Sequence, residues 1–96
     1  MRVVWTGPAL RQLEEIEDYI AQDNPIAAFE VTEAILNRVN KRLPDHPGMG
    51  RPGRTQGTRE LVISDSPYIV AYRIVGSDIQ ILAVMHGAQK WPKAFS

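Results

Sequence analysis

The sequence predicts a single α+β domain, residues 1–96, in which a helical hairpin packs on one face of a mainly antiparallel sheet. Apolar residues recur every three to four positions over 8–20 and again over 25–43, which is the spacing of amphipathic helices. Three later segments alternate their side chains in the period-two manner of strands, and a short apolar segment precedes the first helix. The four strand segments are 2–6, 58–64, 68–75 and 79–86. The predicted order is therefore β-α-α-β-β-β.

The helix boundaries are marked by capping residues and prolines. Thr6 or Gly7 can cap the first helix before Pro8, and the same order recurs at residues 24–25. Pro44 disfavours helical geometry at the residue before it, so we expect the second helix to end there. The short link between the helices predicts an antiparallel hairpin.

The apolar stripe of the second helix is expected to include Phe29 beside Ala28 and Val31. Segment 45–56 is rich in proline and glycine and is predicted to be a loop. Gly76 begins a tight turn between the last two strands.

Charge is distributed unevenly although the formal net charge is zero. Residues 1–35 hold seven acids and two bases, whereas residues 36–96 hold nine bases and four acids. Six of those bases fall between Arg38 and Arg59. This pattern indicates either two solvated surfaces of opposite charge or a local basic binding region.

Composition argues against several classes of site. The chain has no cysteine, and its two histidines stand forty residues apart, so we expect no metal and no cofactor. The glycines of 48–53 lack the strand and helix of a phosphate loop. Neither a secretory signal nor a membrane-spanning apolar run is evident, so the expected location is the cytoplasm, without a membrane.

Two strands are apolar on both faces, and two helices can cover only one face of the sheet. Alternation places Ile69 and Ala71 on one side of their strand, and Leu82 and Val84 on one side of theirs. A contiguous uncovered apolar patch usually marks an interaction surface. The alternative is that the C-terminal tail, with Trp91 and Phe95, folds back over the sheet.

Four arginines are the main candidates for binding chemistry: Arg51, Arg54, Arg59 and Arg73. Guanidinium groups bind phosphates or carboxylates through two parallel hydrogen bonds, so the partner could be RNA or an acidic protein. Arg73 is expected at the rim of the second sheet face. His86, at the end of the last strand, could donate a proton or simply be exposed.

Seven short segments, spread over nearly the whole chain, form a recognisable pattern: Trp5-Thr6-x-x-Ala9, Leu13-x-x-Ile16-x-x-Tyr19-Ile20-Ala21, Asn24-Pro25, His46-Pro47-x-x-Gly50-Arg51, Arg59-Glu60-Leu61, Tyr68-Ile69-Val70-x-Tyr72-Arg73 and Val84-Met85-His86. In their order and spacing, these segments resemble the RelE/ParE superfamily of bacterial toxins. The resemblance implies the growth-inhibiting toxin of a type II toxin–antitoxin module, a class that includes plasmid-stabilising pairs.

A cognate antitoxin partner is also implied by the resemblance, because antitoxins of this superfamily wrap around the toxin and bury its apolar surface. Its expected contacts here are Ile69, Ala71, Leu82 and Val84. Operator DNA would be reached only indirectly, through the antitoxin.

The superfamily contains ParE-like inhibitors of DNA gyrase and RelE-like nucleases that cut mRNA on the ribosome without a metal. Ile69 holds a place where the nuclease branch commonly has arginine, and no tyrosine follows Tyr72. An aliphatic side chain cannot stabilise charge at a cleaved phosphate, so the ParE-like branch is favoured. The residues expected to contact the target are then Arg59, Arg73, His86, Gln89, Lys90 and Trp91.

The alternatives are a RelE-like endoribonuclease and an inactive relative kept as an antitoxin-binding regulator. The nuclease would use a rearranged catalytic set of Arg51, Arg54, Arg59, Arg73 and His86. A gyrase inhibitor would not itself be an enzyme.

Overall fold

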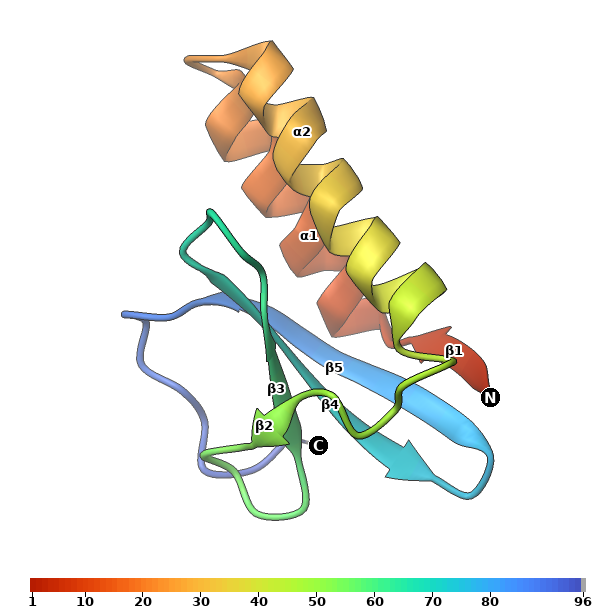
Figure 1. Ribbon diagram of the computed structural model, residues 1–96. Helices are drawn as coiled ribbons and strands as arrows, with labels where there is room; N and C mark the ends of the chain where they lie inside the picture. Colours follow the sequence, from red (N-terminus) through yellow and green to blue (C-terminus); the bar gives the residue numbers. More distant parts are fainter. Residues whose placement is uncertain (96) are drawn as a thin grey trace.

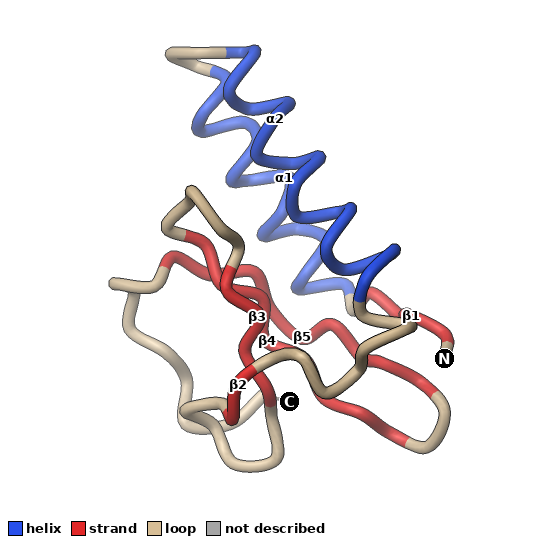
Figure 2. The backbone as a smooth tube through the Cα atoms, viewed as in Figure 1, coloured by secondary structure: helices blue, strands red, loops and turns tan. Residues whose placement is uncertain are grey.

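A hairpin of two helices lies across one face of a five-stranded mixed sheet in the computed structural model, which describes residues 1–95 (Figure 1). The elements are β1 (Arg2–Trp5), α1 (Gly7–Ala21), α2 (Pro25–Leu36), the π-helical turn η1 (Asn37–Arg42), β2 (Arg51–Pro52), β3 (Arg59–Val62), β4 (Tyr68–Val75) and β5 (Asp78–His86). The strand order is β1-β5-β4-β3-β2. Among the described residues, only β1 and β5 pair in parallel, so the predicted α+β fold with a mainly antiparallel sheet is confirmed. Figure 2 shows the strands and the helical hairpin as two layers.

Both helices begin where the sequence predicts. Thr6, rather than Gly7, caps α1 by accepting a hydrogen bond from the backbone N–H of Ala9, and the Asn24 side chain caps α2. The second helix continues through η1 and stops at Leu43, as the following proline predicts.

The main core lies between the helices and the sheet. Its largest fully buried members include Ile35, Val39, Leu43, Val70, Tyr72, Ile79 and Ile81. Phe29 was expected in this stripe, but its side chain is 63% exposed. Consecutive helical residues are rotated by about 100°, so burying Ala28 turns its neighbour toward solvent.

A β-bulge in β5 changes which side chains face the helices. Ala71 pairs with Ala83 and Tyr72 with Ile81, which leaves Leu82 as an extra residue. Beyond this point the alternation of β5 is shifted by one residue. Val84 therefore joins the core beneath the helices, whereas Leu82 belongs to the opposite face, and the prediction that these two share a face is wrong.

The predicted loop at 45–56 contains the short edge strand β2, which pairs with β3 through Arg51–Glu60 and Pro52–Arg59. Proline is tolerated at an edge because its missing N–H would face away from the ladder. The Tyr72 hydroxyl ties the preceding segment to the sheet, since it donates to the Pro47 carbonyl (2.7 Å) and accepts from the Gly50 N–H (2.9 Å). A Cβ on Gly50 would lie 2.7 Å from the Tyr72 ring, so glycine is required there. None of the helices within residues 1–95 is long and apolar enough to cross a membrane.

We expect Tyr72→Phe to lower the free energy of unfolding by about 1–3 kcal/mol, because the buried Gly50 N–H and the Pro47 carbonyl both lose their partner. Burial raises the pKa of Tyr72, which keeps its hydroxyl protonated as a donor at neutral pH. Urea unfolding measures the loss. Tyr68→Phe is the matched control, and an equal change in both variants would contradict the role given to the Tyr72 hydroxyl.

Candidate functional site

A buried carboxylate gathers two of the four predicted arginines. Glu60 lies on β3, opposite Ala71 on the face away from the helices, and is only 2% exposed. Its Oε1 atom accepts from Nε and Nη2 of Arg51 at 3.3 and 3.0 Å. Its Oε2 atom accepts from the backbone N–H of Arg54 at 2.8 Å and lies 3.4 Å from the Nε atom of that residue. The carboxylate therefore offsets one of the two positive charges.

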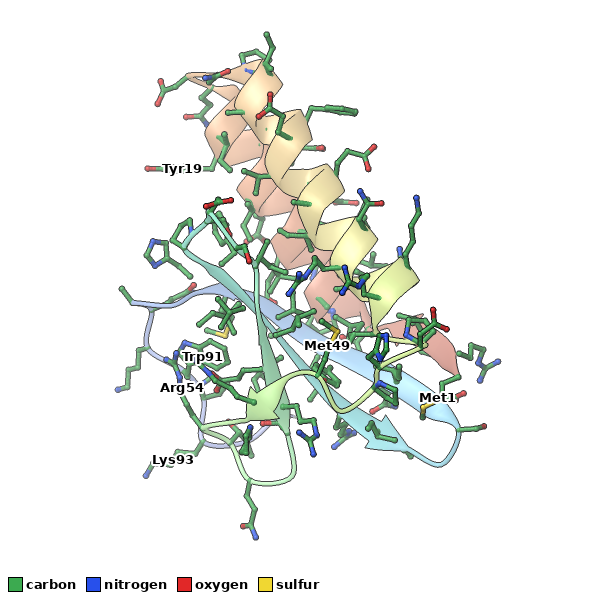
Figure 3. All side chains as sticks on the ribbon, viewed as in Figure 1. Met1, Tyr19, Met49, Arg54, Trp91 and Lys93 are labelled. Atoms are coloured by element: carbon green, nitrogen blue, oxygen red, sulfur yellow. The ribbon has the colours of Figure 1, made fainter. Side chains whose placement is uncertain are left out.

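Arg54 also connects this cluster to the C-terminal tail, residues 87–95. Its guanidinium carbon lies 4.2 Å from the centre of the Trp91 ring, and the two side chains face each other in Figure 3. Its Nη1 atom donates to the Gly87 carbonyl at 3.3 Å. The Thr55 hydroxyl donates to the Pro92 carbonyl at 2.9 Å. These contacts hold the tail across the second sheet face.

The second sheet face is therefore covered by the protein's own tail. Trp91 and Phe95 pack against a buried cluster of Ala71, Leu82, Ala83 and Met85. The alternative in which the tail folds back is the one the structure bears out, and the expectation of an open apolar face is wrong. The cover is imperfect, because the Trp91 indole N–H is buried without a hydrogen-bond partner within residues 1–95.

The predicted antitoxin contacts lie on two faces of the sheet. Ile69, Ala71 and Leu82 are at most 7% exposed on the tail-covered face. Val84 is in the core under the helices, because of the bulge. It therefore presents no surface beside the other three.

The remaining two arginines lie apart from the cluster around Glu60. Arg59 pairs with Tyr72, and its Nη1 atom donates to the carbonyls of Gly48 (3.3 Å) and Gly50 (2.8 Å). Arg73 lies on the opposite face, where its Nε atom donates to the Gln80 side chain at 2.7 Å. The four arginines thus have three different sets of partners: Glu60 for Arg51 and Arg54, backbone carbonyls for Arg59, and Gln80 for Arg73.

His86 borders a cleft of about 160 Å³ between α1 and the end of β5. The cleft is lined by Gln12, Glu15, Ile16, Tyr19, Tyr68, Val84, His86 and Gln89. The His86 and Tyr68 rings meet edge to face at 5.9 Å. Burial, and to a smaller extent Tyr19, raises the pKa of Tyr68, so its hydroxyl is a donor and not a base. Tyr19 projects from the helical hairpin beside this cleft (Figure 3).

Among the described residues, 1–95, no three histidine, aspartate or glutamate side chains gather as metal ligands. The Nδ1 atom of His86 accepts from the Ala88 N–H at 3.1 Å, which leaves the neutral ring's proton on Nε2. Gln89 and Lys90 are exposed at the start of the tail.

The organising role of Glu60 was missed in the sequence. The available signal was an acid at an alternating strand position with three arginines within nine residues. Gln12, whose Oε1 atom accepts from the Val84 N–H, was also missed. Nothing in the sequence signals this contact, because a glutamine on an amphipathic helix is ordinarily a surface residue.

Comparison with known proteins agrees with this architecture. Residues 3–91 match the family model of the ParE toxin of the type II toxin–antitoxin system parDE. A Sinorhizobium fredii protein named "Putative toxin Y4kP" is 50% identical over 92 residues, covering 96% of this chain and 94% of that protein. Toxin RelE2 of Caulobacter vibrioides is 34% identical over 88 residues, covering 92% of this chain and 97% of the relative.

Two solved structures share the fold. A chain of the chromosomal ParDE toxin–antitoxin system from P. aeruginosa superposes with a TM-score of 0.76 and 27% identity, covering 90% of this chain and 95% of that one. A chain of the RelBE2 toxin–antitoxin complex from Mycobacterium tuberculosis gives a TM-score of 0.65 at 23% identity, covering 88% and 95%, and this likeness concerns the fold alone. With a family match over nearly its whole length and a relative of 50% identity, the chain belongs to the ParE toxins of type II toxin–antitoxin systems, within the RelE/ParE superfamily.

Proposed function

We propose that this toxin inhibits growth by binding DNA gyrase and is neutralised by direct binding of its cognate antitoxin. The observation that carries the choice of target is the dispersal of the arginines. Cleavage of RNA requires cationic groups that converge on the phosphate whose charge develops. Here Glu60 engages Arg51 and Arg54, backbone carbonyls engage Arg59, and Gln80 engages Arg73.

Ile69 supports the same choice. Its aliphatic side chain is 7% exposed on the tail-covered face, so neither its chemistry nor its position suits a phosphate. Residues after Tyr72 include no tyrosine that could act as a tail acid or base. Inhibition by protein–protein contact needs none of these groups.

The proposed antitoxin partner is supported by the relatives. The P. aeruginosa neighbour is described as a ParDE toxin–antitoxin system, and the matching family model describes parDE toxins. Any contact with operator DNA is assigned to the antitoxin, and gyrase as target places the action in the cytoplasm.

Ribosome-dependent mRNA cleavage is the second candidate, favoured by the relative named Toxin RelE2 and by the His86–Tyr68 cleft. It would use Arg51, Arg54, Arg59, Arg73 and His86. Those groups would first have to leave their present partners and move to one site.

Two assays separate these functions. We expect the purified toxin to inhibit plasmid supercoiling by gyrase and to leave mRNA intact on translating ribosomes, because its arginines do not converge. Adding the cognate antitoxin should restore supercoiling. Codon-phased mRNA cuts with normal supercoiling would contradict the gyrase proposal, and a chain without toxicity in either assay would be the inactive relative.

The proposed target contacts are Arg59, Arg73, His86, Gln89, Lys90 and Trp91. Arg73 is the most informative of them, because Arg59 also anchors the carbonyls of Gly48 and Gly50. We expect Arg73→Ala to lower gyrase inhibition about tenfold, a typical loss for an interface arginine. The free energy of unfolding should change by less than about 0.5 kcal/mol. Lys93→Ala, an exposed tail cation, is the control, and equal inhibition by both variants would remove Arg73 from the target surface.

Glu60→Gln tests whether the arginines are held by the buried carboxylate. We expect the free energy of unfolding to fall by about 1–3 kcal/mol, because charged hydrogen bonds to Arg51 and Arg54 are lost. The loss should be accompanied by increased solvent exposure of Trp91, read by fluorescence quenching in a Trp5→Phe background. Asp65→Asn makes the same charge change at an exposed turn and is expected to leave both quantities unchanged.

A further inference from the structure

The outer edge of β5, residues 82–86, has no neighbouring strand within residues 1–95. The parallel partner β1 ends with Trp5 opposite Ile81, and β5 continues past it (Figure 2). The N–H of Gly87 donates to the carbonyl of Pro67, while His86 stands opposite Tyr68. In an antiparallel ladder the bonded positions alternate, so Val84 and His86 direct their backbone groups away from β4.

Both outward N–H groups are capped by glutamine side chains. The N–H of Val84 donates to Oε1 of Gln12, from α1, at 2.9 Å. The N–H of His86 donates to Oε1 of Gln89, from the tail, at 2.9 Å. An uncapped edge is a template for pairing with another chain, and these two amides block it without forming a strand. A carbonyl from an incoming strand would make the same bonds.

A hollow lies on each side of this edge. The His86 cleft is on the helix side, and its apolar floor includes Ile16 and Val84. A second hollow of about 250 Å³ lies on the tail side, where Leu82, Met85 and Phe95 are among the lining residues. Side chains of a strand alternate between its two faces, so an added strand would place successive side chains in the two hollows.

We propose that the outer edge of β5 is a strand-addition site for an extended segment of the cognate antitoxin, with Gln12 and Gln89 as displaceable caps. This inference rests on the antitoxin partner proposed above. The segment presents an apolar side chain to the tail-side hollow. It presents lysine or arginine to the His86 cleft, where Glu15 supplies a carboxylate and Tyr19 a ring.

Charge distinguishes this occupant from a second copy of the toxin. Helix α1, which flanks the edge, carries four acids and only one base, Arg11. Pairing two β5 edges would bring two such helices together, and like charges at close range oppose association. A single extended segment with basic side chains meets no such opposition.

The test compares His86→Pro with His86→Ala. Both variants lose the imidazole, but only proline removes the outward N–H, and the bonds to β4 do not use that N–H. With the cognate antitoxin as the probe, we expect His86→Pro to bind about twofold to tenfold more weakly than His86→Ala in calorimetry, the effect of one hydrogen bond. Equal affinities for a pair of variants that both fold would overturn the strand-addition site.

Removal of either glutamine cap is expected to change the affinity for the antitoxin in the opposite direction. We expect Gln89→Ala and Gln12→Ala to bind the antitoxin more tightly than the wild-type toxin, since no intramolecular bond must break first. Gln56→Ala, an exposed loop glutamine, should bind as wild type does. Weaker binding by both cap variants would show that the glutamines contact the antitoxin directly and would contradict the proposed displacement.

Amide hydrogen exchange on the wild-type complex needs no variant and serves where His86→Pro does not fold. Exchange at Val84 and His86 should slow on antitoxin binding, whereas unchanged exchange at both amides would overturn the site. If the antitoxin does not bind the wild-type toxin at all, the proposed partner fails together with this site. If it binds and the edge amides do not respond, only the site fails.

Discussion

The arrangement of the basic surface depends on one buried carboxylate. Glu60 lies on β3 opposite Arg51 of the short strand β2, and by accepting from Arg51 and Arg54 it fixes the segment that joins β2 to β3. Arg54 then lies over Trp91 and donates to the tail backbone. A buried carboxylate is tolerable only when its oxygens are well bonded, so ordering of this segment, partial neutralisation of the arginines and attachment of the tail occur together.

The bulge at Leu82 decides what each part of β5 faces. Before it, Ile79 and Ile81 point into the core under the helices; after it, Val84 takes that role. The extra residue places Leu82 and Ala83, which are adjacent in sequence, in the same cluster beneath the tail. Both faces of β5 are therefore covered around the bulge, which explains why the strand is apolar without interruption from Ile81 to Met85.

Helix boundaries and four of the five strands were predictable because their determinants are local: caps and prolines for the helices, a short apolar segment for β1, and alternation for β3, β4 and most of β5. The bulge was not predictable, since no glycine or proline marks Leu82, and strict alternation then misplaced Val84. β2 was missed because two residues, one of them proline, carry no period. For the candidate site, the sequence singled out four arginines, but the partners that hold them, such as Glu60 and Gln80, come from distant positions and carry no local signal.

The second face of the sheet and the outer edge of β5 are covered by side chains of this toxin, and not by further helices or strands. The tail covers one face but leaves the Trp91 N–H buried without a partner within residues 1–95. This unsatisfied donor offsets part of the free energy gained from burying the indole ring. On the outer edge of β5, two glutamines stand where a strand would pair. Each glutamine belongs to a segment that other contacts hold in place. Loss of a cap therefore costs one hydrogen bond and leaves the core intact. A partner that offers the same hydrogen bonds can therefore replace these contacts without disrupting the core.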